Sequence, residues 1–301
     1  MTPRPKKHHY VPKSYLAGFT PSGGVEDSLW VHREGKSRKS KPEACAFERE
    51  YYSRTEAGTG YSDLESRLGV IEGAGMNVIK GIVAGGRLPG GEELDPLLDF
   101  VAIMSTRGPN TRERFDEFVS EVSRKYLIIA KHCESWNKGE HPGHDSTSPS
   151  AEEIDEFKKS ELGPDHKLLP FLDGVEVVKK CLVGRQWAVW RTAETAARLI
   201  TTDNPVIIDW MFPTDTRDLP GHAHRHTMLS MPLTKRLLLV GCHEAAMDVQ
   251  EPMPIEIVAC QNGLRLVRAR HEAFSCEADF PILLPEKGVV GIQSLAATGA
   301  E

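Results

Sequence analysis

Two adjacent histidines, His8 and His9, stand near the start of the sequence and are followed by Pro12. A neutral imidazole can accept a proton or bind a metal ion, and Pro12 would fix the turn beside the rings. Neighbouring side chains of a strand point to opposite faces, so at most one of the two histidines can enter a given pocket. The alternative is a solvated arm, because Lys6 and Lys7 come directly before them.

A second polar group lies in Thr201-Thr202-Asp203-Asn204-Pro205, directly after an apolar segment. The Asn-Pro pair is typical of a sharp turn. Asp203 could orient an imidazole or bind a divalent cation. The alternative is structural, with the Thr, Asp and Asn side chains of this segment bonding to the backbone of the turn.

Glu65 and Glu72 are seven positions apart and would share one face of a helix. Such paired carboxylates could hold a metal ion or divide acid and base roles. Ser62 and Glu65 also fit a capping box, which would give Glu65 a structural task. Arg107 precedes Gly-Pro, where it could hold a phosphate or carboxylate or offset the helix dipole.

Three further histidines, at 222, 224 and 226, would share one face of a strand and could trap zinc or nickel. Their polar, loop-like neighbours favour adventitious metal binding at the surface. The sequence contains no GxGxxG, Walker A, HExxH, GxSxG or CxxC motif, which argues against the enzyme classes that depend on them.

Composition places the chain among ordinary globular proteins, with 301 residues, 40% hydrophobic and 27% charged, and a formal charge of -6. Residues 1–41 nevertheless carry nine Lys/Arg against three acidic residues, which suits a polyanion or a phosphate-bearing ligand. The alternative is a solvated arm. No apolar run approaches the roughly 18 residues of a membrane span, and the basic start lacks the apolar segment of a secretory signal. Six cysteines without a pairing pattern indicate thiols in a reducing cytoplasm.

The elements that would position these residues follow from periodicity and turn signals. Tyr10, Val11, Tyr15, Leu16 and Phe19 predict that segment 8–20 packs into the core. A hairpin is expected with a strand over 29–33 and a turn over 34–36. Helices are expected over 62–85, 92–107, 110–135 and 151–160, with a loop over 136–151. Paired strands over 186–192 and 198–202 should follow, then strands over 206–208, 226–232 and 236–240 and a closing helix within 254–274.

This order predicts an α+β fold with an N-terminal β-hairpin, a helical middle and a C-terminal, mostly antiparallel sheet. We expect a single intertwined domain over 1–290 with a tail over 291–301. The loop over 136–151 is the place where the domain could divide.

The motifs together resemble the DUF4238 family, a domain of unknown function, over about residues 6–276. The match runs through KHHYVPKSYLAGFT, LWVHREG, AFEREYY, DLESRLGVIE, STRGP, LITTDNPV, MPLTKRLLLV and VACQNGLRLVRARHEAFS. By this resemblance the marked positions are His8, His9, Pro12, Tyr15, Leu16, Phe19, Trp30, Glu48, Tyr51, Glu65, Glu72, Arg107, Asp203, Asn204 and Pro205. So many dispersed polar residues imply a shared site.

The opening HHxxP is also similar to the first strand of His-Me finger nucleases. Here, however, no Asn or His follows on a helix after the hairpin, and only Glu48 and Asp203 could take that place.

Two functions therefore remain open. The first is a metal-assisted hydrolase of phosphodiesters such as nucleic acid, with His8 or His9 as base. Asp203 with Glu65 or Glu72 would then bind Mg²⁺ or Mn²⁺, and Arg107 would hold phosphate beside the ligand-binding residues Asn204 and Glu48. The second is a binding protein that recognises a small ligand or a partner through the same residues. Neither reading involves a membrane, and the sequence does not indicate an oligomeric state.

Overall fold

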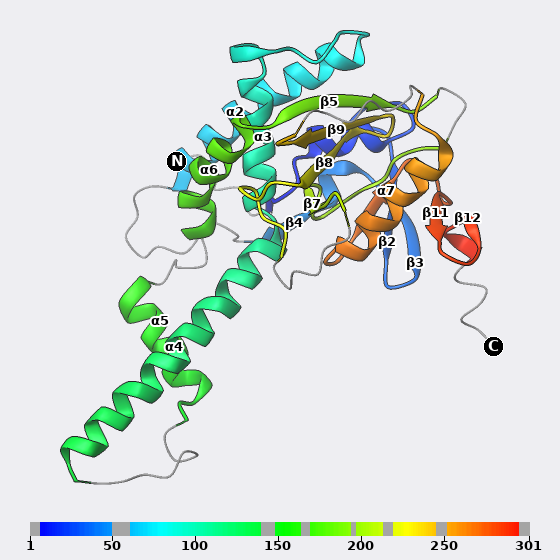
Figure 1. Cartoon of the computed structure of the whole chain (residues 1–301). Coiled ribbons are helices and arrows are strands. Elements are labelled where there is room, and N and C mark those ends of the chain that lie inside the picture. Colours follow the sequence, from blue (N-terminus) through cyan, green and yellow to red (C-terminus); the bar gives the residue numbers. More distant parts are fainter. Residues whose placement is uncertain are drawn as a thin grey trace.

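The computed structural model of the chain describes residues 7–49, 61–139, 148–163, 169–193, 197–212, 219–244 and 252–294 (Figure 1). For 61–64 and 169–173 it describes the backbone alone. Helices and antiparallel sheets both contribute, so the fold is α+β as expected.

The larger antiparallel sheet has the order β5-β9-β8-β7. Its strands are Gln186–Arg191, Leu237–Cys242, Thr227–Thr234 and Ile207–Trp210 in that order. Every residue of β9 is buried, because both faces of the sheet are covered. Leu237 and Leu239 join the main core, whereas Leu238 and Val240 join a smaller core on the opposite face.

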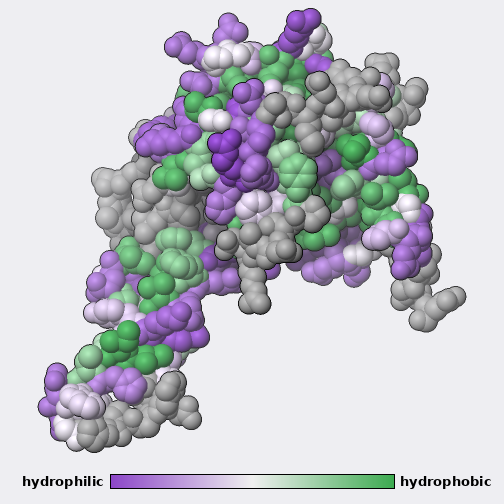
Figure 2. Space-filling model, viewed as in Figure 1, coloured by the Kyte–Doolittle hydropathy of each residue, from purple (hydrophilic) through white to green (hydrophobic). Residues whose placement is uncertain are grey.

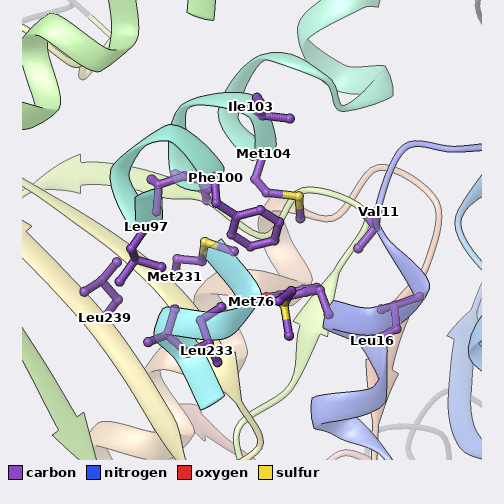
Figure 3. Packing of buried hydrophobic residues seen from close by; sticks show 14 of the residues in the cluster. Val11, Leu16, Met76, Leu97, Phe100, Ile103, Met104, Met231, Leu233 and Leu239 are labelled. Atoms are coloured by element: carbon purple, nitrogen blue, oxygen red, sulfur yellow. The ribbon is translucent and has the colours of Figure 1, made fainter. Parts of the chain in front are cut away.

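A helical layer covers the main-core face of this sheet. It consists of α2 (Tyr61–Val83), α3 (Asp95–Thr106) and α6 (Leu169–Val183), with α3 packed against both of the others. Figure 3 shows Phe100 and Met104 of α3 beside Met76 of α2 and Met231 of β8. Gly75 permits this approach, since a Cβ there would lie 2.5 Å from the Cβ of Phe100.

The N-terminal segment completes the main core, as its apolar residues predicted. It comprises α1 (Lys13–Leu16) and a 3₁₀ turn (Ala17–Phe19), and the side chains of Tyr15, Leu16 and Phe19 are fully buried. The hydroxyl of Tyr15 donates a 2.6 Å hydrogen bond to the carbonyl of Pro232 in β8. Segment 8–20 is therefore part of the core rather than a free arm.

The second antiparallel sheet has the order β3-β2-β10-β6. The expected hairpin forms its first half, with β2 at Leu29–Arg33 and β3 at Lys36–Ser40. Lys36, Arg38 and Lys39 lie on β3, which is the edge strand, and charged residues there discourage pairing with another chain. Strand β10 (Ala273–Ser275) joins the hairpin to β6 (Thr201–Thr202).

Two small antiparallel pairs and one helix complete the body. Strand β1 (Lys7–His9) pairs with β4 (Phe47–Arg49), and β11 (Pro281–Leu284) with β12 (Gly288–Gly291). Helix α7 (Ile255–Arg268) lies over the smaller core and packs against β11. Short 3₁₀ turns occupy Pro42–Ala44 and Gly91–Glu93.

A helical arm projects from the body. It consists of α4 (Pro109–Asn137), which extends well beyond the other elements, and α5 (Ala151–Leu162), which lies along it (Figure 1). A capping box starts α5, in which Ser150 Oγ accepts from the N–H of Glu153 and the Glu153 carboxylate accepts from the N–H of Ser150.

Several sequence-based predictions are wrong in detail. Segments 186–192 and 198–202 do not pair, because β5 pairs with β9 and the shorter β6 with β10. The expected helix within 254–274 ends at Arg268, and its last residues form β10. Ser62 lies inside α2 rather than before it, and its side chain is outside the described residues, as are 140–147 of the expected loop.

Candidate functional site

His8 and His9 lie on opposite faces of β1, as strand geometry requires. His8 is buried, and its Nδ1 lies 3.4 Å from a carboxylate oxygen of Glu65 on α2. The partner of His8 in strand β4 is Glu48. This arrangement ties the first strand of the chain to the helical layer.

The ring of His9 packs 5.9 Å from that of Phe47 and is held by one hydrogen bond of 3.1 Å, between Nε2 and the carbonyl of Glu43. A carbonyl only accepts, so Nε2 carries the proton, and Nδ1 of the neutral ring is the basic nitrogen. Burial lowers the pKa of His9, against the hydrogen bond to Glu43, and the positive charges of Arg107, Lys13 and Lys7 lower it further. His9 is therefore a neutral base near pH 7.

Arg107 directly follows the last turn of α3, and its guanidinium donates to the carboxylate of Glu72. Both side chains are largely buried. Burial raises the pKa of Glu72, and the opposing charge and hydrogen bond of Arg107 hold it down. We call His8, His9, Glu65, Glu72 and Arg107 the histidine cluster.

Asp203 serves a different purpose. It is fully buried, and its carboxylate accepts hydrogen bonds from the backbone N–H groups of Arg270, His271 and Glu272 at 2.9, 2.5 and 3.2 Å. The expected contact between Asp203 and either histidine is not among those of the described residues. The carboxylate instead fixes the backbone between α7 and β10, whereas the structural alternative placed its bonds on the backbone of its own turn.

Glu48 faces the first turns of α4, where it forms an exposed ion pair of 3.5 Å with Arg112. Together with Pro109, Glu113 and Asp116, these two residues line a small pocket of about 200 Å³. Asn204 lies on the other side of α4. Its side-chain amide is 3.4 Å from the carbonyl of Arg268, and its backbone N–H donates to Thr202 Oγ1.

A larger pocket of about 360 Å³ lies between the start of α4, the turn at Asn204 and the end of α7. Arg114, Arg268 and Arg270 line it, and we call it the arginine pocket. Its other polar side chains are Ser105, Asn110, Thr111 and Asn204, and none of the described residues that line it is acidic.

The three arginines differ in their partners. Arg270 pairs with Glu113 at 2.6 Å, and Arg268 approaches Asp209 at 3.8 Å. Arg114 is exposed and has no ion pair within the part of the chain that the structure describes. Sequence reasoning missed this pocket, although Arg268 and Arg270 stand in the VRAR segment of the last family motif. The spacing of Arg268 and Arg270 alone does not predict that both side chains line one pocket. That follows only from the end of helix α7, which lies between them.

The other predicted metal ligands are the histidines at 222, 224 and 226. Within the described ranges, no group of three or more His, Cys, Asp or Glu side chains is placed to hold a metal ion. The three later histidines do not share a strand face, since β8 begins after them. Burial lowers the pKa of His222 to about 4, His224 stacks on Trp210, and His226 lies 3.5 Å from Glu244.

No helix among the described residues is both long and apolar enough to span a membrane. No curated protein and no solved structure matches the chain. The family model described as "Protein of unknown function (DUF4238)" matches residues 7–279, which include the histidine cluster and the arginine pocket. The chain therefore belongs to the DUF4238 family.

Proposed function

We propose that the protein binds a small phosphate-bearing ligand in the arginine pocket. The observation that carries this proposal is the convergence of Arg114, Arg268 and Arg270 on a cavity with no acidic residue among its described lining residues. Guanidinium groups match phosphate oxygens in charge and geometry. A volume of about 360 Å³ falls within the usual size of small-molecule sites.

The start of α4 adds to this preference. The helix begins at Pro109 without a side-chain cap, and Asn110 and Thr111 of its first turn line the pocket. The amino end of a helix carries partial positive charge and attracts anions. The amides of Asn110 and Asn204 can donate to further ligand oxygens, so the pocket offers donors on several sides.

Isothermal titration with pyrophosphate tests the proposal, with Arg114→Gln as the variant and Arg124→Gln on the exposed arm as its matched control. Among the described residues Arg114 has no ion pair to lose, so its substitution should leave the fold intact. We expect Arg114→Gln to bind pyrophosphate about tenfold more weakly than the native protein, or weaker still, because one charge-assisted hydrogen bond is removed. Equal affinity of both variants, or no binding by the native protein, would reject the proposal.

A second candidate function is hydrolysis of phosphodiesters, which the basic Nδ1 of His9 favours. His9 would take the proton of an attacking water while Arg107 offsets charge on the phosphate. Mg²⁺ or Mn²⁺ would bind Glu65 or Glu72 through the second carboxylate oxygen, since His8 and Arg107 each contact one oxygen of these groups.

Turnover of bis(p-nitrophenyl) phosphate and of single-stranded DNA, with and without Mn²⁺, tests this second function. His9→Gln should abolish turnover and leave pyrophosphate binding unchanged. Turnover that His9→Gln retains would remove His9 as the base. Absence of turnover alongside intact binding would leave the ligand-binding proposal standing alone.

A further inference from the structure

The arginine pocket has an apolar part as well as a basic one. Leu219 and Pro220, which come before β8, line it together with Ile208 of β7 and Val267 of α7. These elements are distant in the sequence, and the fold brings their aliphatic side chains to one cavity. The arginines offer this cavity to an anion, and the aliphatic side chains offer a surface from which a ligand can displace water.

Two of these aliphatic side chains are open to water. Val267 is 81% exposed, which is the highest fraction among the large apolar side chains that the structure describes, and Leu219 is 65% exposed. Neither belongs to a hydrophobic core of the described residues. Packing of the core therefore does not account for them, whereas a ligand that covers them gains free energy from their burial.

Exposed apolar side chains also occur outside the pocket. Figure 2 shows hydrophobic surface on the arm, well away from the body, and Val122 of α4 is 50% exposed. Leu219 and Val267 differ from Val122 because they line the same cavity as three arginines. A ligand that meets both kinds of side chain has an anionic part and an apolar part.

The lining favours an aliphatic group over a nucleobase as the apolar part. No aromatic side chain is among the described residues that line the pocket. Proteins commonly hold bases by stacking them on aromatic rings. Trp210, at the end of β7, stacks on His224 instead. A flat base would lack a stacking partner in this lining, whereas an alkyl group packs against leucine and valine.

Size and charge restrict the ligand further. A volume of about 360 Å³ is near the lower end of the usual range for small-molecule sites, so a phosphate group leaves room for a short chain only. The formal charge of -6 disfavours approach of the protein to an anionic lipid surface. Both observations favour a soluble ester over the headgroup of a membrane lipid.

Resting on the proposed function, we infer that the ligand of the arginine pocket is a soluble phosphate monoester of a short aliphatic group. The phosphate lies against Arg114, Arg268 and Arg270, which supply the positive charge. The aliphatic group lies against Leu219 and Val267 and removes them from water.

Isothermal titration with methyl phosphate and butyl phosphate tests the inference through the ratio of the two affinities. We expect the native protein to bind butyl phosphate about tenfold more tightly, because the additional methylene groups partly leave water. Val267→Ser should fold normally and lower this ratio to about threefold, since part of the apolar lining is removed. Arg114→Gln should weaken both esters and keep the ratio. Val122→Ser on the arm is the matched control and should show the native ratio.

The outcomes separate this inference from the proposed function. Equal affinity of the native protein for the two esters, or a native ratio in Val267→Ser, would overturn the inference and leave the proposed function standing. Tighter binding of adenosine monophosphate than of butyl phosphate would overturn the aliphatic class. Flotation of the protein with vesicles of phosphatidylcholine and phosphatidic acid would overturn the soluble source. No binding of either ester or of pyrophosphate would reject the proposed function and this inference with it.

Discussion

The carboxylate of Glu65 lies 3.4 Å from Nδ1 of His8, and so the first strand of the chain is held by the helical layer. Asp203, which the sequence offered as the partner of a histidine, binds backbone amides instead. The HHYVP motif and the DNPV motif thus have separate tasks. The first belongs to the histidine cluster, and the second shapes one wall of the arginine pocket.

Asp203→Asn should destabilise the protein. An amide offers one acceptor oxygen where the carboxylate offers two, and its NH₂ group would face a backbone donor. We expect a loss of about 1–3 kcal/mol or more in the free energy of unfolding, measured by urea denaturation. Asp209→Asn, at a partly exposed position, is the control. Native stability of Asp203→Asn would show that the backbone does not depend on this carboxylate.

Arg107→Met should lower the free energy of unfolding by about 3–5 kcal/mol, since it leaves the Glu72 carboxylate buried without its cation. The double variant Glu72→Leu/Arg107→Met should recover part of this loss, because the unpaired charge is gone. Chemical denaturation of the two single variants and the double variant measures the coupling. A double variant no more stable than Arg107→Met would contradict a role of this pair in the folded state.

His32 predicts a dependence of stability on pH. Its ring bonds to Ser37 and Ser275 across β2, β3 and β10, and burial lowers its pKa to about 4. The unfolded chain takes up this proton first, so stability present above pH 6.5 is lost as the pH falls towards 4. The loss is on the order of 2 kcal/mol after allowance for partial exposure to water. Melting temperatures of the native protein and of His32→Gln across this pH range measure the loss of stability, with His271→Gln as the control. Parallel curves for the native protein and His32→Gln would exclude His32 as the source of the pH dependence.

Ser150→Ala should destabilise α5 by about 1 kcal/mol, because it removes the acceptor of the capping box. Amide hydrogen exchange over 151–162 should accelerate while exchange in β9 stays constant. Ser160→Ala, later in the same helix, is the control. Faster exchange throughout the body would mean that α5 is coupled to the core rather than to the arm alone.

Local patterns predicted the elements well and their partners poorly. Strand β9 and the hairpin turn at Glu34-Gly35 can both be recognised from short runs of neighbouring residues. The pairing of β10 with β2 cannot be recognised in this way, because Ala273–Ser275 is too short to show a strand period and lies shortly after a helix. Ser62 and Glu65 fit the sequence pattern of a capping box. The helix already includes Ser62, however, and the carboxylate of Glu65 lies beside His8.

The candidate site was predictable in part. The resemblance marked the histidine cluster, and strand alternation separated His8 from His9. The arginine pocket could not be found in this way, because Arg114 and Arg270 come together only through the close approach of α4 to the end of α7. Asp203 fixes that approach through backbone bonds, for which the sequence has no signature.

The position of β10 between β2 and β6 also governs how the chain is made. His32 and Ser275 are hydrogen-bonded across 243 positions, so the amino-terminal hairpin waits unpartnered while the rest is translated. At roughly 5–20 residues per second this interval is about 12–50 s. The charged residues of β3 disfavour pairing of this edge with another chain in the meantime, and the second sheet closes only after Ser275 has been translated.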